Sequence, residues 1–366
     1  MKIMTVLGTR PEIIRLSLVI KRLDEIAQHV VVHTGQNYAE SLNDIFFRDL
    51  GVRPPDHSLG IRTDWMGEQV GRIIADTEKL IVREKPDRLL ILGDTNSGLA
   101  AIPAKRHAVP VYHMEAGNRC YDDRVPEEIN RRIIDHCSDV LMPYTQRSKE
   151  NLVREGIERE RIFVTGNPIF EVLEHFRPQI DASDVFRRLN ITKGQFFLVT
   201  MHRAENVDVE SRLRDLVAAL QGLAAAYRQP IICSLHPRTK AKMEQFGIRG
   251  DDPLIRWMEP LGFFDFVALE RSARCVLSDS GTVQEECAIF GVPNLTIRDV
   301  TERPETIECG SNVLSGSDPK SILGLVAMLL ASSPSWSAPP EYLQRNVSMT
   351  VAKLLMGYRH GIHSNG

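Results

Sequence analysis

The apolar positions in the first half of this chain fall into short runs that alternate with longer amphipathic stretches. The stretches 12–26 and 68–85 repeat apolar residues with the period of a helix. Apolar runs rich in β-branched residues, separated by such helices, are typical of a parallel sheet covered on both faces. The strands predicted here are 2–8, 29–35, 88–94, 111–116, 140–144 and 161–166.

The second half repeats this arrangement, which predicts strands at 195–201, 230–236, 254–259, 275–280 and 293–297. A chain of 366 residues is too long for one ordinary core. The periodicity breaks at "HFRPQIDASD", residues 175–184. We therefore predict an α/β protein with two Rossmann-like, doubly wound domains that face a cleft. The predicted domains are 1–178 and 179–340, followed by a segment 341–366 whose helix packs back on the first domain.

Composition and charge exclude several classes of protein. The net charge of −3 offers no electrostatic footprint for nucleic acid or an anionic membrane. The start, "MKIMTVLGTRPEI", is too short and charged for a signal peptide, and no run approaches the length of a membrane span. The six cysteines are scattered without a C-x-x-C pair, so we expect reduced thiols in a cytoplasmic protein and no metal site.

The end of the first predicted strand reads "GTRPE", residues 8–12. A glycine turn followed by a helix start, with Arg10 beside it, is suited to binding a phosphate. A plain turn with a solvated arginine explains the same residues about equally well. The turn is not G-x-G-x-x-G, and the strand 29–35 ends without an acid that could hold a ribose. A dinucleotide cofactor is therefore not expected.

Three carboxylates stand near the ends of the next strands. Asp94 and Glu115 follow predicted strands, and Glu127 follows Pro126 at the start of a helix that also carries Arg131. A structural alternative exists for two of them: Asp94 could cap a helix, and an acid such as Glu127 is common in the first turn of a helix. Glu115 has no such alternative, because glutamate is a poor helix cap. Crowded carboxylates separate each other's pKa values, which allows acid and base roles at neutral pH.

The second domain places a different set of groups at its strand ends. His202 and His236 end two strands, and "DSGT", residues 279–282, opens a helix whose amides and hydroxyls are suited to a phosphate. Glu286 lies a turn further into that helix and could accept hydrogen bonds from a ribose. A well-capped helix is the alternative. The combination indicates an enzyme that acts on a nucleotide-linked substrate by acid–base chemistry.

These motifs together resemble the non-hydrolysing UDP-N-acetylglucosamine 2-epimerases. The matching stretches span residues 8 to 305: "GTRPE", "GDT" (93–95), "EAG" (115–117), "PEEINR" (126–131), "HRAEN" (202–206), "HP" (236–237), "DSG", "QEE" (284–286) and "RDVTERPE" (298–305). The resemblance implies a glycosyltransferase-B-like fold, usually a homodimer, and no cofactor. It implies that UDP-GlcNAc and UDP-ManNAc interconvert through elimination of UDP to a 2-acetamidoglucal and re-addition.

The resemblance also implies roles for individual residues. Asp94, Glu115 and Glu127 correspond to the catalytic carboxylates, and His202 to a group that stabilises the departing diphosphate. The expected substrate contacts are Arg10, Ser280 and Gly281 with phosphate, Glu286 with ribose, Phe266 with uracil, and Arg15, Arg131, His236 and Arg298 as further contacts.

This chain departs from the common pattern of the family at several positions. Arg15 replaces a usual lysine, Asn118 stands in "EAGNRC" where many members read "EAGLR", and Thr282 replaces a glycine. The "GNRC" and "DSGT" forms resemble a branch that acts on related UDP-N-acetylhexosamines on the route to UDP-N-acetyl-L-fucosamine, and such a sugar is one alternative substrate. The stretch "QNYAES" (36–41) also differs from the family's usual allosteric sequence. A hydrolysing epimerase, a glycosyltransferase and a non-catalytic UDP-sugar sensor are the remaining alternatives.

Overall fold

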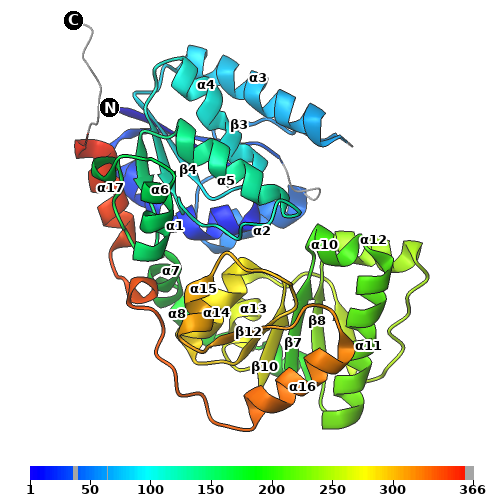
Figure 1. Ribbon diagram of the computed structural model, residues 1–366. Coiled ribbons are helices and arrows are strands. Elements are labelled where there is room, and N and C mark those ends of the chain that lie inside the picture. The colour runs from blue at the N-terminus through cyan, green and yellow to red at the C-terminus, as the bar shows by residue number, and fades with distance from the viewer. Residues whose placement is uncertain (36–39, 64, 359–366) are drawn as a thin grey trace, which may run out of the picture. The chain divides into compact units, whose positions relative to one another are not determined.

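The computed structural model describes residues 1–35, 40–63 and 65–358 (Figure 1). It divides into two compact units. The first contains Met1–Glu174 together with Glu341–Gly366, and the second contains His175–Pro340. The boundary predicted from the sequence was 178/179, at the same break in periodicity. Of the "QNYAES" stretch, residues 36–39 lie outside the described part of the chain.

The first unit is built on a parallel sheet with the strand order β3-β2-β1-β4-β5-β6 in the described residues. The sequence runs β1 to β6, so the order reverses direction between β1 and β4. In the register of the central pair, Val6 stands opposite Ile91. The strands are β1 (Lys2–Leu7), β2 (Gln28–His33), β3 (His57–Ser58), β4 (Arg88–Leu92), β5 (Val111–Met114) and β6 (Val140–Met142).

Helices cover this sheet because its strands are apolar on both sides. On one face, Met4 and Val6 pack with Ile81 of α3, Ala104 of α4 and Ile134 of α5. The helical elements of this unit are α1 (Arg10–Ile26), α2 (Glu40–Asp49), α3 (Met66–Glu84), η1 (Asn96–Ala100), α4 (Ala101–Arg106), α5 (Pro126–Cys137), α6 (Gln146–Arg154), η2 (Arg159–Arg161), α7 (Ile169–His175), η3 (Pro340–Leu343) and α17 (Val347–Gly357).

The second unit repeats the topology. Its described strands form a parallel sheet in the order β12-β11-β10-β7-β8-β9, which reverses between β7 and β10. Residue Leu277 of β10 stands opposite Val199 of β7. The strands are β7 (Phe197–Met201), β8 (Ile231–Leu235), β9 (Ile255–Met258), β10 (Cys275–Ser278), β11 (Asn294–Thr296) and β12 (Asn312–Leu314).

The helices α11 and α16 lie side by side over one face of the second sheet (Figure 1). The helices of this unit are α8 (Arg177–Asp181), α9 (Val185–Leu189), α10 (Ala204–Val207), α11 (Glu210–Tyr227), α12 (Pro237–Gln245), α13 (Phe263–Glu270), α14 (Gly281–Phe290), α15 (Pro304–Glu308) and α16 (Pro319–Leu330). The prediction of two doubly wound, Rossmann-like sheets is confirmed. In such sheets ligands bind beyond the carboxyl ends of the strands, at the reversal of strand order.

The C-terminal helix α17, red in Figure 1, packs along α1 in the first unit. The buried guanidinium of Arg88, on β4, donates to the carbonyl of Leu355 near the end of α17. The Tyr112 hydroxyl donates to the carbonyl of Tyr358. The last described residues of the chain are therefore hydrogen-bonded to strands of the first sheet.

The strand predicted at 161–166 does not form. This segment makes one isolated bridge, Leu141 with Ile162, after the 3₁₀ turn η2. Its neighbour β6 has three residues and ends at Met142. The backbone N–H groups of Phe163 and Thr165 donate to the carbonyls of Leu141 and Pro143, which is too little pairing to define a strand. The ring of Phe163 instead packs edge-on against Tyr358, with ring centroids 4.6 Å apart. The apolar run at 161–166 predicts a strand, whereas the structure uses its Phe163 to pack against Tyr358.

Candidate functional site

The turn between β1 and α1 is organised by Glu12. Its Oε2 accepts hydrogen bonds from the backbone N–H groups of Gly8 and Thr9, at 3.0 and 2.7 Å, and its Oε1 accepts one from the Thr95 hydroxyl at 3.1 Å. Burial raises the pKa of Glu12 to about 7, against the lowering effect of these hydrogen bonds. Glu12 therefore ties the predicted phosphate turn to the end of β4. Arg10 begins α1, half-buried, with its guanidinium carbon 5.8 Å from the centre of the Phe46 ring.

Glu115 follows β5 directly. Its backbone φ of 65° lies in the left-handed region, which residues other than glycine rarely adopt. Its Oε2 accepts from Arg15 Nη1 at 2.7 Å and from the Tyr144 hydroxyl at 3.1 Å. Asn118 Nδ2 lies 3.4 Å from its Oε1. Arg15 and Asn118, two positions where this chain departs from the common family pattern, thus both contact Glu115.

Asp94 lies beyond β4 and is held by Arg131 of α5. Arg131 Nε and Nη2 approach Asp94 Oδ2 to 2.8 and 2.7 Å. Asp94 follows Gly93, whose φ of 74° turns the chain at the strand end. A side chain at position 93 would come within 3.9 Å of Glu115 Oε2. The turn that carries Asp94 and the carboxylate of Glu115 are therefore neighbours, as the sequence predicted.

The two acids at the start of α5 have different surroundings. Glu127 is half-buried, four residues before Arg131 and hence on the same helix face. Glu128 is fully buried, accepts from the backbone N–H groups of Cys120 and Tyr121, each at 3.1 Å, and from Arg131 Nη1 at 2.7 Å. Burial raises its pKa, but these hydrogen bonds and the charge of Arg131 outweigh burial, so the pKa lies below the usual range. Glu128 fastens the 120–121 loop to the helix.

A buried network beneath the strand ends was not predicted from the sequence. His113, on β5, has Nδ1 2.8 Å from Asp135 Oδ1 and Nε2 2.8 Å from the carbonyl oxygen of Gly93. Asp135 also accepts from the Gly117 N–H at 3.1 Å and pairs with Arg119 at 2.8 Å. The network links the turns after β4 and β5 to α5, so it positions Asp94 and Glu115 relative to each other.

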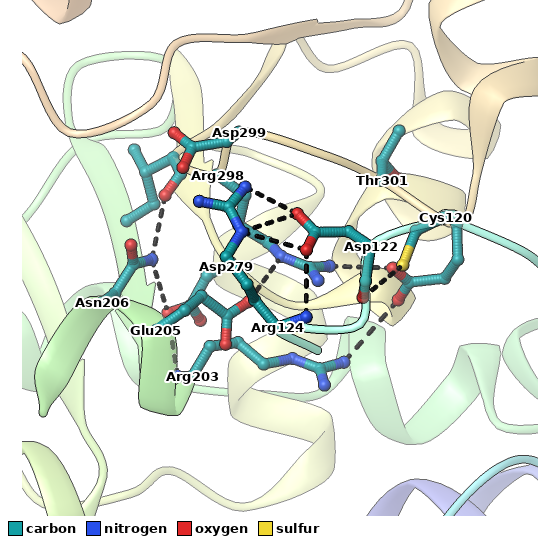
Figure 2. Close-up of polar contacts among 12 residues, drawn as sticks. Cys120, Asp122, Arg124, Arg203, Glu205, Asn206, Asp279, Arg298, Asp299 and Thr301 are labelled. Carbon is teal, nitrogen blue, oxygen red and sulfur yellow. Dashed lines mark hydrogen bonds and ion pairs between the residues drawn. The ribbon is translucent and has the colours of Figure 1, made fainter. Parts of the chain in front are cut away.

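In the second unit, Asp279 organises the end of β7. Its fully buried carboxylate accepts from the backbone N–H group of His202. It also accepts from the backbone N–H group of Arg203 and from Asn206 Nδ2 (Figure 2). His202 Nδ1 lies 3.2 Å from Asp279 Oδ1, which leaves Nε2 on the far side of the ring. The His202 and His236 rings are neighbours, with centroids 5.6 Å apart. The predicted histidines are thus brought together beside the strand reversal.

The N-terminus of α14 follows β10 on the other side of this reversal. Ser280 precedes the helix, and its hydroxyl lies 3.0 Å from that of Thr282. A Cβ added to Gly281 would meet Glu302 Oε1 at 2.8 Å, so any larger residue there would displace the buried Glu302 carboxylate. The sheet topology therefore places the predicted phosphate-binding residues next to His202.

Arg298, 1% exposed, lies inside the second unit instead of on its surface. Its Nε donates to Glu205 at 3.1 Å and its Nη1 to Glu302 at 2.9 Å (Figure 2 shows Arg298 beside Glu205). Burial lowers its pKa, but the charges of Glu302 and Glu205 outweigh that effect and raise it. Among the described residues, no hydrogen-bond partner lies near its Nη2.

Two helices carry the remaining predicted contacts. Phe266 is half-buried on α13, and Glu286 is nearly buried on α14. Glu270, four residues after Phe266, is completely buried and was not singled out from the sequence. The other groups that sequence reasoning missed are those that hold predicted residues in place: Glu12, Asn118, Glu128, Asp135, Tyr144 and Asp279. Several of them stand within the quoted motifs, but the sequence could not distinguish a residue that positions a site residue from one that would contact the substrate.

Within the described ranges, no set of three or more His, Cys, Asp or Glu side chains is arranged to hold a metal ion. No helix in the same part of the chain combines the length and the apolar character needed to cross a membrane.

Comparisons with known proteins agree with the resemblance seen in the sequence. The family model described as UDP-N-acetylglucosamine 2-epimerase matches residues 21–356. A UDP-N-acetylglucosamine 2-epimerase from Methanocaldococcus jannaschii is 40% identical over 93% of this chain and 95% of its own length. A UDP-2,3-diacetamido-2,3-dideoxy-D-glucuronate 2-epimerase from Pseudomonas aeruginosa is 38% identical over 87% of this chain and 89% of its own.

A solved structure supports the same relationship. The crystal structure of Methanocaldococcus jannaschii UDP-GlcNAc 2-epimerase in complex with UDP-GlcNAc and UDP superimposes with a TM-score of 0.93 and 38% identity. The match covers 97% of this chain and 99% of that one. The resemblance predicted from the motifs is confirmed.

Proposed function

Because the chain belongs to the UDP-N-acetylglucosamine 2-epimerase family, we propose that it is an isomerase that interconverts UDP-GlcNAc and UDP-ManNAc without releasing free sugar. The observation that carries this proposal is the pair of carboxylates, Asp94 and Glu115. Arginines fix both at the ends of the neighbouring strands β4 and β5.

The C2 hydrogen of an N-acetylhexosamine is not adjacent to a carbonyl, so direct deprotonation is unfavourable. Removal of the C2 proton by a base is therefore coupled to the loss of UDP: the electron pair of the C2–H bond forms a C1–C2 double bond while the bond from C1 to the UDP oxygen breaks. UDP then adds back to C1 while a proton is delivered to the opposite face of C2. Two faces of the sugar require more than one acid–base group, which Asp94, Glu115 and Glu127 supply.

We assign Arg15, Tyr144 and Asn118 to the orientation of Glu115, and Arg131 to the orientation of Asp94. Both assignments follow from the hydrogen bonds of these side chains. A base must keep its lone pair aimed at one hydrogen, and several fixed donors restrict a carboxylate in that way.

The second unit supplies the UDP-binding groups in this proposal. Ser280 and Gly281 at the start of α14 bind phosphate oxygens, together with Arg10 of the first unit. His202, held through Nδ1 by Asp279, directs Nε2 to the departing diphosphate. Glu286 accepts from the ribose and Phe266 stacks on the uracil. The remaining contacts are His236, beside His202, and Arg298, whose Nη2 is the donor left after its two ion pairs.

The first experiment is proton NMR of the purified protein with UDP-GlcNAc in D2O. We expect a UDP-ManNAc signal to appear with deuterium at C2, since the acid that protonates the opposite face of C2 has exchanged its proton with solvent. Release of free ManNAc and UDP would instead identify a hydrolysing epimerase. Epimerisation without deuterium at C2 would contradict the elimination mechanism.

A second candidate is 2-epimerisation of a related UDP-N-acetyl sugar. It is favoured by Asn118 and Arg15, which surround Glu115, and by the similarity to the Pseudomonas aeruginosa relative. The same NMR experiment with diacetamido, uronate and 6-deoxy UDP-sugars separates the two. A kcat/KM for one of these at least tenfold above that for UDP-GlcNAc would select the second candidate.

We also propose that the enzyme is a homodimer, as the resemblance implies. Ile129 and Ile133, four residues apart on the same face of α5, are 49% and 38% exposed and form an apolar pair that a second copy could cover. Light scattering of the full chain should give a mass near twice 41.3 kDa. A mass of one chain at micromolar concentration would contradict this.

A further inference from the structure

Two carboxyl groups face each other inside the second unit. Glu270 ends α13 with no exposed surface, and Glu286 lies on the neighbouring helix α14 with 6% of its surface exposed. The Glu286 carboxyl is within hydrogen-bonding reach of Glu270. The Cys287 thiol, next to Glu286, donates to Glu270 Oε1 with a separation of 3.8 Å. If Glu270 and Glu286 are both ionised, no hydrogen-bond donor among the described residues reaches the buried Glu270 Oε2.

This arrangement is stable only if the pair retains a proton. Two ionised carboxylates have acceptors and no donor, so they cannot hydrogen-bond to each other. The groups that act on Glu270 within the described chain are Glu286 and Cys287, and Cys275 of β10 lies close to that thiol; no arginine or lysine is among them. Burial, reinforced by the charge of Glu286, raises the pKa of Glu270 well above its usual range.

The position of the pair connects it to the proposed nucleotide site. Phe266 and Glu270 are four residues apart on α13, so they share a face of that helix. Glu286 is five residues into α14 from Gly281, roughly 7.5 Å along the helix axis at 1.5 Å per residue. A phosphate at the start of α14 therefore leaves the ribose close to Glu286. Glu270 lies behind Glu286, away from solvent.

We propose that Glu270 is a neutral carboxylic acid that donates a hydrogen bond to Glu286 and thereby holds the Glu286 carboxylate toward the ribose hydroxyls of the substrate. Glu270 is thus a positioning residue for the choice of ribose over deoxyribose. This inference rests on the proposed function, since it takes Glu286 as the ribose contact. One oxygen of Glu286 accepts from Glu270, and the other accepts from the sugar.

The test is calorimetric titration of the full chain with UDP and with 2′,3′-dideoxy-UDP. The ratio of the two dissociation constants measures the ribose contact. In Glu270→Met, an apolar replacement of similar length, we expect this ratio to fall about tenfold, as for the loss of one charged hydrogen bond. In Glu270→Gln the neutral amide donates as the acid does, so the ratio should stay within about twofold of the wild type.

A folded Glu270→Met protein with the wild-type ratio would overturn the proposal. So would a Glu270→Gln protein that loses as much as Glu270→Met. If Glu270→Met does not fold, the difference between the infrared spectra of the wild type and of Glu270→Gln at pH 7.5 tests whether Glu270 is protonated. A protonated-carboxyl band should be present in the wild type, and its absence overturns the proposal.

Failure of the proposed function has a different appearance. A wild-type protein that binds neither UDP nor its dideoxy analogue would contradict the proposed function itself, and the infrared band would still test the shared proton. A wild-type protein that prefers UDP, with a ratio unchanged by Glu270→Met, would contradict only the role of Glu270.

Discussion

At the scale of single residues, the strongest structural sign of function is the backbone of Glu115. A non-glycine residue with φ near +65° carries a strain of order 1–3 kcal/mol, and such residues concentrate at functional sites. The strain is maintained by the hydrogen bond from the Glu115 N–H to Met142 and by the side-chain bonds to Arg15 and Tyr144. A glycine here would relieve the strain but remove the carboxylate.

Replacing Glu115 with Gln should therefore separate catalysis from binding. The amide keeps the size of the side chain but cannot accept the C2 proton, so we expect kcat to fall by on the order of 10²–10⁴. The dissociation constant for UDP should change less than threefold, since the proposed UDP-binding groups lie mainly on the second unit. A variant with near-normal kcat would remove Glu115 from the catalytic assignment.

Glu12 makes the stability of the protein depend on pH. Its folded-state pKa of about 7 lies above the ordinary value of 4.5, so the folded chain binds a proton more tightly than the unfolded chain. The stabilisation is complete below about pH 4.5 and is lost as pH rises through 7. Between pH 5 and 7.5 the loss from this one group is about 2 kcal/mol.

The variant Glu12→Gln should lack this contribution. We expect its free energy of unfolding, relative to the wild type, to improve by about 2 kcal/mol when urea denaturation is moved from pH 5 to pH 7.5. Glu244→Gln, an exposed glutamate on α12, is the control and should show no such change. A constant difference between Glu12→Gln and the wild type would contradict the raised pKa.

At the scale of elements, the start of α5 carries one acid that stabilises the fold, Glu128, and one that is proposed to act in catalysis, Glu127. Pro126 begins the helix, as its sequence indicates, and the acids after it favour the positive end of the helix dipole equally. Their environments then differ, because Glu128 points into the fold against Arg131 whereas Glu127 remains half-exposed.

The pair of variants Glu127→Gln and Glu128→Gln should separate these purposes. Glu128→Gln leaves a buried arginine with one anion fewer, so we expect a loss of about 2 to 3 kcal/mol in the free energy of unfolding. Glu127→Gln should change stability by less than about 0.5 kcal/mol but lower kcat at least tenfold. Thermal melts and initial rates measure both. An unstable Glu127→Gln with normal kcat per folded molecule would reverse the assignment.

At the scale of the whole molecule, the first unit is made from two separate parts of the sequence. The chain completes the first sheet, builds the second unit, and returns at residue 341 to place α17 against α1. The second unit is continuous and contains its own apolar core, centred on β7, α11 and α16.

Truncation should therefore affect the two units differently. We expect the fragment 175–340 to fold alone, with a cooperative urea transition, and to bind UDP more weakly than the full chain. The fragment 1–340 exposes the face of α1 that α17 covers and leaves Arg88 without its carbonyl acceptor, so its first unit should melt well below that of the full chain. Circular dichroism of both fragments checks this. A fragment 1–340 as stable as the full chain would contradict it.

The sequence by itself determined the features that depend on local pattern. Periodicity sets where strands and helices alternate, the chain length requires two cores, and the parallel-strand rule places Asp94, Glu115, His202 and Ser280 at strand ends. All of these follow from backbone geometry and the burial of apolar side chains, which neighbouring residues in the chain control.

Tertiary structure alone decided which polar side chains position their neighbours through buried hydrogen bonds and which are exposed enough to meet a substrate. The chemistry of a helix start suits Glu127 and Glu128 equally; the family resemblance implied Glu127, and the structure supplies the physical difference, which is the burial of Glu128 against Arg131. Arg15 meets Glu115 across 100 residues, and Glu270 meets Glu286 between two helices. The apolar run at 161–166 packs against Tyr358 and does not extend the sheet. Such pairings depend on distances between segments that are remote along the chain, and no local pattern encodes those distances.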